Sequence, residues 1–332
     1  MTPLPSPRGP LTEALLARLV RPVHALPSVP EPDDPEDLQL GLYLCYELHY
    51  RGLPGVADDW EWEPSLLAVR RALEDRFESE LLERVPREAE DLAAEETDLA
   101  LRAIDEADEA PSLSRYLERD GTLAQFQEFA VHRSAYQLKE ADPHSWAMPR
   151  LHGRPKAALV EIQADEYGGG RPERIHAQLF ADAMEALGLD PTYGAYVDLL
   201  PAATLQTVNL MSLCGLHRRL RGAIVGHLAL FEMTSSVPNR RYAAGLRRLG
   251  FSGAATAFFD EHVEADAVHE AVASVDLAGG LIRQDPALAG DVLWGARCLA
   301  ALEGEWAAML LGAWEDGRTS LRAPLTDPAV PA

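Results

Sequence analysis

The sequence has little cysteine and no excess of positive charge. Its three cysteines, Cys45, Cys214 and Cys298, are far apart and form no CxxC pair. They indicate neither a disulfide framework nor a cysteine-ligated zinc site, and their number is typical of a reducing compartment. The formal net charge of the 332 residues is -23. This acidity argues against nucleic acid and anionic membranes as partners, because both are bound by basic surfaces.

Long apolar runs and strand-like alternation are also missing. Glu13 and Arg18 interrupt the only apolar stretch near the start, and nowhere do about 18 uncharged apolar residues follow one another. We therefore expect a protein without a signal peptide or membrane span, located in the cytoplasm. Helical periodicity, broken by proline and glycine, runs along almost the whole chain, so the expected fold class is all-α.

One expected helix, over residues 256–275, carries ionisable side chains on its apolar face. Phe259, His262, Asp266, His269 and Ala273 follow one another at spacings of three and four residues, which is the spacing of one buried stripe. A buried carboxylate costs several kcal/mol unless it is compensated, so the stripe requires a partner. Two imidazoles and a carboxylate suit iron, manganese or zinc. Two ordinary core histidines with an incidental acid between them are the alternative.

The stretch EIQADEYGGGRPERIH contains a second such pair. Leu159, Ile162 and Glu166 lie on one helical stripe, which puts Glu166 inward at the end of its helix. The glycines 168–170 end that helix, and Pro172 suits the first turn of the next one, whose apolar stripe begins with His176. The break allows two consecutive helices to present Glu166 and His176 to the same point.

Two further acids, Glu140 and Glu232, end the apolar stripes of their helices. Each alone is more typical of a helix-end acid that reaches water. Together with Glu166 and Asp266, however, they carry four negative charges, which two ferrous ions would neutralise and a single zinc ion would not. The two ExxH motifs of ferritin-like di-iron bundles are absent from these helices, so another helical scaffold is required.

This combination resembles the haem-oxygenase-like di-iron oxidases, which include the iron-containing redox enzymes. The similar segment runs from about residue 38 to about residue 315, and LYLCYELHYRG followed by WEWEP is similar to the amino-terminal part of such proteins. The residues that the resemblance implies as metal ligands are Glu140, Glu166, His176, Glu232, His262, Asp266 and His269. Glu166 would bridge the two metals, and Asp165 and Glu161 would orient ligands or lie on the surface.

The resemblance implies a seven-helix haem-oxygenase-like bundle with an additional N-terminal helical segment, two irons per chain and no haem. Fe(II) and O₂ would give a peroxo-di-iron(III) species, which in relatives serves N-oxygenation, oxidative C–C cleavage or desaturation. The expected domains are a Pro-rich segment at 1–36, the di-iron domain at 37–318 and a flexible tail at 319–332.

The expected activity is that of a non-haem di-iron oxidoreductase acting on a small amine, amino acid or carboxylate, with an external electron donor as a possible partner. A metal-dependent hydrolase and a non-catalytic bundle that binds a small molecule or metal stay open as alternatives. The tyrosine-rich segment near residues 40–62 either covers one side of the bundle or forms a homodimer contact. Candidates for the substrate pocket are Tyr136, Arg133, Met211 and Phe231, whereas His217 and His227 are interpreted as ordinary polar or core residues.

Overall fold

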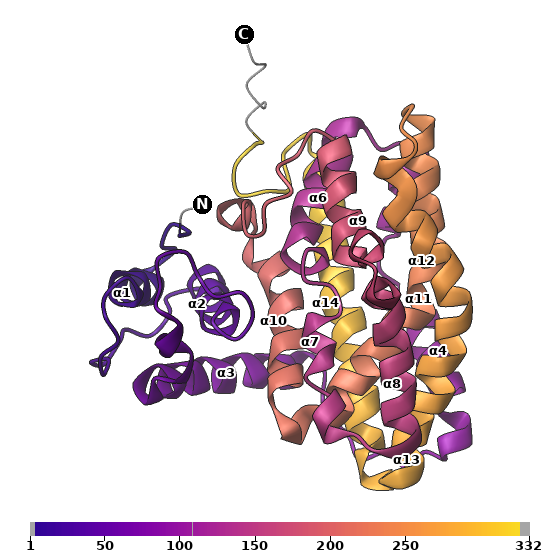
Figure 1. Cartoon of the computed structure of the whole chain (residues 1–332), viewed down its shortest axis with the longest axis horizontal. Helices are drawn as coiled ribbons and strands as arrows, with labels where there is room; N and C mark the ends of the chain where they lie inside the picture. The colour runs from indigo at the N-terminus through magenta and orange to yellow at the C-terminus, as the bar shows by residue number, and fades with distance from the viewer. Residues whose placement is uncertain (1–3, 108, 326–332) are drawn as a thin grey trace.

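The structure is a computed structural model, and it describes residues 4–107 and 109–325, without the side chains of residues 265–268. Within these residues every regular element is helical and no strand occurs, which confirms the expected all-α class. The elements form a helical bundle with α1 and α2 at one side, next to α10 (Figure 1).

The first helices precede the bundle or cover it. They are α1 (Pro10–Leu19), α2 (Pro35–Glu47), α3 (Pro64–Arg84), α4 (Thr97–Glu106) and α5 (Leu113–Arg119). The helices that follow are α6 (Leu123–Gln137), α7 (Asp142–Ser145), α8 (Gly153–Glu166), α9 (His176–Ala186), α10 (Ala202–Leu216), α11 (Arg221–Arg248), α12 (Ala254–Ala271), α13 (Gly280–Gln284) and α14 (Ala289–Glu315).

Shorter helical turns connect these helices. They are η1 (Asp58–Trp62), η2 (Ala94–Glu96), η3 (Met148–Arg150), η4 (Gly168–Gly170), η5 (Pro172–Arg174), η6 (Val197–Leu199), η7 (Arg218–Leu220) and η9 (Pro286–Leu288), all of them 3₁₀. The segment η8 (Val272–Gly279) is a π-helix that continues α12. Helical segments of this kind occur frequently at functional sites.

The Pro-rich N-terminal segment contains a helix that is held firmly in place. The carboxylate of Asp37 accepts hydrogen bonds from the backbone N–H groups of Leu11 and Thr12, each at 2.9 Å, and so satisfies donors at the start of α1. Leu11 and Leu15 are fully buried. At the other end, Ser320 and Leu321 are also buried. The domain boundaries after residues 36 and 318 stay predictions.

The tyrosine-rich helix α2 is buried within the chain itself. Residues 37–49 are all shielded from solvent, and α2 packs against α1, α3 and α10. Of the two roles expected for this segment, the structure shows the first, which is to cover one side of the bundle. A homodimer contact through its aromatic face is therefore not required to bury these tyrosines.

The central helix of the bundle, α11, contacts α14 at unusually short range. Gly226 on α11 faces the backbone of Val292, and Gly295 on α14 faces the backbone of Ala223. A Cβ atom at either glycine would overlap the carbonyl oxygen opposite, so the helices can approach this closely only because side chains are absent there. This contact fixes the position of α11, which also carries Glu232.

The bundle has two apolar core clusters, and α11 runs between them. Ile162 and Leu228 belong to one cluster, whereas Tyr136 belongs to the other. Phe231 packs against both. Because Tyr136, Ile162, Leu228 and Phe231 also line one small cavity, that cavity lies where the two clusters meet.

We expect Gly226→Ala to destabilise the protein by about 2 to 3 kcal/mol, because the added methyl group forces two helix backbones apart. Gly312→Ala is the matched control, since it lies on α14 with nothing near its Cβ position. It should leave stability unchanged or raise it by up to about 1 kcal/mol. Urea unfolding of both variants checks this, and equal midpoints would contradict the close contact.

Candidate metal centre

The chain breaks between α8 and α9 so that Glu166 and His176 meet. As predicted, Glu166 is the last residue of α8 and His176 is the first of α9. Gly168, Gly169 and Gly170 have φ values of 64°, 59° and 79°, a region that favours glycine. Pro172 differs from the prediction: it begins the 3₁₀ turn η5 and not α9 itself, because three more residues are needed before the chain can turn back.

Four buried side chains form the first group of potential metal ligands. Glu140, Glu166, His176 and His262 each offer one ligand atom, and these atoms all lie within 4.8 Å of one another. Nδ1 of His176 lies 3.1 Å from Oε2 of Glu166 and 4.0 Å from Oε2 of Glu140. Nε2 of His262 lies 3.5 Å from Oε1 of Glu140. One ion with bonds of about 2.0 to 2.2 Å would place its ligand atoms about 3 to 4 Å apart, as seen here.

Two atoms of this group are buried with poor or no hydrogen bonding. Oε2 of Glu140 has no hydrogen-bond partner within the described part of the chain, and Nδ1 of His176 has only its ion-pair contact with Glu166. Unsatisfied buried polar atoms are costly and therefore rare. A cation between them would satisfy both, which is the observation that fits this group to a metal.

The ring of His262 is oriented by the backbone of its own helix. Its Nδ1 lies 2.8 Å from the carbonyl oxygen of Phe258, so Nδ1 carries the hydrogen and donates it. Nε2 is therefore the nitrogen that faces Oε1 of Glu140. Ligating histidines are commonly held in this way by a carbonyl or carboxylate.

Glu166 also belongs to a second group, with Glu232 and His269. Nδ1 of His269 lies 3.2 Å from Oε2 of Glu232, and its Nε2 lies 3.0 Å from Oδ2 of Asp165. Asp165 thus contacts the outer nitrogen of His269, which agrees with the orienting role expected for it. Glu166 is thus common to both groups.

The structure brings together six of the seven predicted ligands, three from sequence-distant helices and three from the α6–α9 region. Asp266 lies on α12, but its side chain is outside the described residues. Its assignment as a ligand therefore stays a prediction.

The charges of the site compensate one another. Burial raises the pKa of Glu140. Burial also opposes ionisation of Glu166, but the nearby imidazoles, His176 first, outweigh it and lower the pKa of Glu166 to about 2. Burial likewise disfavours charge on His269, yet its contacts with Glu232 and Asp165 raise its pKa to about 9. Without a metal, protons on the imidazoles balance the buried carboxylates.

A strained turn positions Glu140 after α6. Ala141, the next residue, has φ of 73°, and apart from the glycines it is the one described residue with a positive φ. Such outliers cost of the order of 1–3 kcal/mol and persist only where neighbours hold them. Here Gln163 donates a hydrogen bond to the carbonyl of Ala141 at 3.0 Å, and Tyr167 donates one to Asp142 at 2.8 Å. Both donors lie near the end of α8, so they fix Glu140 relative to Glu166.

The residue before Glu140 is a buried lysine that points away from the site. Lys139 pairs with Glu47 of α2, and its ammonium lies 4.2 Å from the centre of the Tyr50 ring. Tyr193 donates a further hydrogen bond to Glu47 at 2.6 Å. A buried charge requires a partner, and α2 supplies one. The lysine is thereby kept from pairing with the acids of the metal site.

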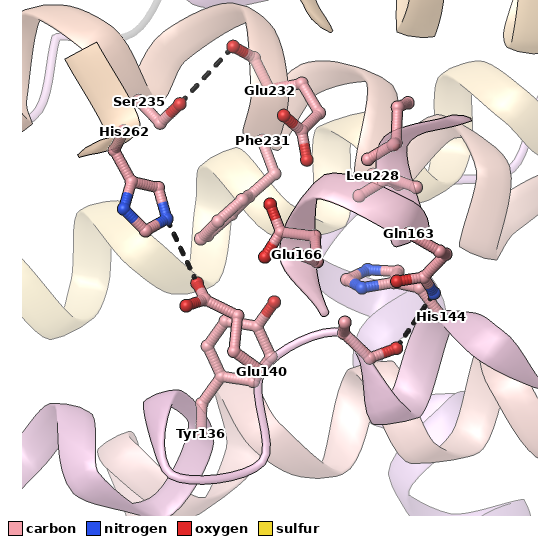
Figure 2. Close-up of a pocket in the computed structure, with 12 residues that line it drawn as sticks. Tyr136, Glu140, His144, Gln163, Glu166, Leu228, Phe231, Glu232, Ser235 and His262 are labelled. Carbon is pink, nitrogen blue, oxygen red and sulfur yellow. Dashed lines mark hydrogen bonds and ion pairs between the residues drawn. The ribbon is translucent and has the colours of Figure 1, made fainter. Parts of the chain in front are cut away.

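A cavity of about 10 Å³ lies between the two ligand groups. Figure 2 shows the carboxylates of Glu140, Glu166 and Glu232 directed at this space, with the rings of Tyr136 and Phe231 beside them. These two aromatic residues were predicted to line the substrate pocket, and both lie in the wall of this cavity. Met211, also predicted, lies outside the residues that line this cavity and is buried on α10.

His144 and Gln163 are among the residues of the cavity wall that sequence reasoning missed. His144 lies four residues after Glu140, and in a helix this spacing places two side chains on the same face. Its Nε2 lies 3.2 Å from Nδ1 of His227. Burial lowers the pKa of His144 to about 4 and that of His227 further, so both are neutral. The interpretation of His227 as a buried polar residue outside the ligand set agrees with this geometry.

A family model described as iron-containing redox enzyme matches residues 127–304, more than half of the chain. The chain belongs to the iron-containing redox enzyme family. The matched segment contains all seven predicted ligands and begins after α5. It confirms the family resemblance and the haem-oxygenase-like bundle, and it identifies an iron-dependent redox function. No curated protein matches the chain. Among the described residues, no helix has the length and apolar character that a membrane crossing requires.

The metal-free protein should lose stability as pH rises. His269 has an ordinary pKa of 6.5 and a pKa of about 9 in the fold, so its contribution is complete below pH 6.5 and disappears on approach to pH 9. His176 shifts in the same direction. We expect the free energy of unfolding of His269→Gln, measured with urea, to fall less between pH 6.5 and pH 9 than that of the wild-type protein.

His132→Gln is the control. Burial lowers the pKa of His132 to about 3, so this variant should lose as much stability between pH 6.5 and pH 9 as the wild-type protein does.

Proposed function

We propose that this protein is an O₂-dependent, non-haem di-iron oxidoreductase that acts on a small molecule. The observation that carries the proposal is the pair of buried ligand groups with Glu166 in common. Family membership supports iron and redox chemistry, and the presence of two ligand groups supports two ions per chain.

The first iron would be held by Glu140, Glu166, His176 and His262. The second would be held by Glu166, Glu232 and His269, and Asp266 is proposed as its further ligand. Carboxylate and imidazole ligands suit iron, and no thiolate lies in either group. The buried acids would be neutralised by the ions, which replace the protons of the metal-free state.

The dimensions of the site favour iron ions over haem. The cavity between the ligand groups measures about 10 Å³, roughly the space for one water molecule. A macrocycle would have to displace the three carboxylates that point into it. Two irons bound here would supply the electrons for O₂ reduction and the oxidising power for the substrate.

The protein's own residues fix the ligands and limit access. The carbonyl of Phe258 and the carboxylate of Asp165 each orient one imidazole, His262 and His269 respectively. Tyr136 and Phe231, whose ring centres lie 5.8 Å apart, form an apolar wall over the carboxylates. This wall excludes bulk water, which strengthens every electrostatic interaction inside the site.

Iron loading tests the proposal. The metal-free protein is loaded anaerobically with Fe(II), bound iron is counted, and O₂ consumption and visible absorption are followed after exposure to air. We expect about two irons per chain, one for each ligand group, with rapid O₂ uptake. If the wild-type protein binds no iron, or binds a redox-inert metal and consumes no O₂, the proposal is overturned and a hydrolase or a binding protein is favoured.

Variants distinguish a bridge from two separate sites. Glu166→Ala should lose both irons, whereas His269→Ala should retain about one, because only Glu166 belongs to both groups. Glu161→Ala, an exposed position on the same helix, is the control and should load normally. Asp165→Asn should weaken the second site by about 10- to 100-fold. Retention of one iron in Glu166→Ala would show that this carboxylate does not bridge.

A further inference from the structure

A second, much larger cavity adjoins the metal cavity. This chamber has a volume of about 600 Å³, within the usual range of about 300 to 1,000 Å³ for small-molecule sites. Phe231 and Ser235 line both cavities, so the chamber reaches the metal site at these two residues. Its wall comes from α4, α5, α6, α9, α11, α12 and α14, with residues 110–112 between α4 and α5.

The chamber is largely apolar and aromatic. The rings in its wall are those of Phe129, Phe180, Phe231, Tyr242, Phe258, Phe259 and Trp306. Rings of this kind bind apolar bodies, and their faces attract cations. A ligand that fits this space has an extended apolar or aromatic body.

Two polar atoms in the chamber wall are buried without a hydrogen-bond partner among the described residues: the side-chain oxygen of Gln137 and Nε1 of Trp306. Trp306 offers a neutral donor, whereas Gln137, which is 8% exposed, offers an acceptor. A buried amide oxygen without a donor is unfavourable, so the fold alone does not explain why glutamine stands here. Rotation of the carboxamide about its last bond exchanges the oxygen and the NH₂ group at nearly equal shape, which allows the oxygen to face the chamber.

The charges nearby decide between an amine and a carboxylate as the head group. Arg133 lines the chamber one helical turn before Gln137, but both of its terminal nitrogens bond to the carboxylate of Glu303, at 2.9 and 2.6 Å. Arg241, also in the wall, lies 3.9 Å from Glu118. Arg133 therefore has no terminal nitrogen left for a carboxylate, and the charge of Arg241 is balanced by its ion pair with Glu118. Both oxygens of Glu303 are taken by Arg133, so the unpartnered oxygen of Gln137 and the aromatic faces are the groups that suit an ammonium.

We propose that the chamber binds an amine with an aromatic or extended apolar body, and that Gln137 determines specificity by accepting a hydrogen bond from the amine nitrogen. The amine is then the anchor, and the far part of the body reaches the metal cavity past Phe231. That the bound amine is the substrate rests on the proposed function. Gln137 acts through binding and holds no iron.

The test uses the metal-free full chain and two probes with the same body, 4-phenylbutylamine and 4-phenylbutyrate. Isothermal titration calorimetry should show the amine binding at least about tenfold more tightly than the carboxylate, the size expected for one charge-assisted hydrogen bond. Gln137→Met, of similar shape without the amide, should lose this preference. Gln178→Met, on the exposed face of α9, should retain it.

Stability separates a ligand-binding amide from a structural one. Removal of an unpartnered buried amide should leave the thermal midpoint of Gln137→Met unchanged or raise it. A marked fall of the midpoint, or a failure to fold, would show a structural role and overturn the proposal, as would equal affinities of the wild-type protein for the two probes. Iron loading of the wild-type protein is measured separately: normal iron uptake without amine selectivity refutes the chamber assignment alone, whereas amine selectivity without iron uptake refutes the proposed function alone.

Discussion

Buried negative charge is the constraint on which the rest of this structure depends. Glu140, Glu166 and Glu232 are 4%, 6% and 5% exposed, and Glu140 and Glu232 each offer a ligand atom within 4.8 Å of one from Glu166. Such an arrangement is unstable unless cations compensate it. Protonated imidazoles do so in the metal-free protein, and iron would do so in the loaded one. Lys139, the nearest alternative cation in the sequence, is instead paired with Glu47 by the tyrosine-rich helix α2. The N-terminal region therefore influences the metal site without contributing a ligand.

The second requirement is precise placement of helices that are far apart in the sequence. Glu232 is positioned by α11, and α11 is positioned by its glycine-mediated contact with α14. Glu140 is positioned by a strained turn that Gln163 and Tyr167 hold against α8. Each ligand thus depends on a contact made elsewhere in the bundle.

The two cavities have different proposed roles, metal binding at the small cavity and binding of an organic ligand in the chamber. The metal cavity is too small to contain more than a water-sized molecule, whereas the adjoining chamber has room for an organic ligand. Phe258 belongs to both arrangements, because its ring lines the chamber and its carbonyl orients His262. A ligand that moves this residue would also move an imidazole of the first group. Binding and metal geometry are therefore mechanically connected through α12.

The sequence by itself determined the helical class, the break between Glu166 and His176, and the candidate ligands, because helical spacing places ionisable residues on apolar faces. Local spacing also predicted Tyr136 and Phe231 near the site. It did not predict that Glu166 is common to two ligand groups, that His144 joins the cavity wall, or that Gln137 is left without a partner. Those facts depend on which helices are neighbours and how closely they pack. Only the tertiary structure decides this, since the contacts join residues more than 20 positions apart.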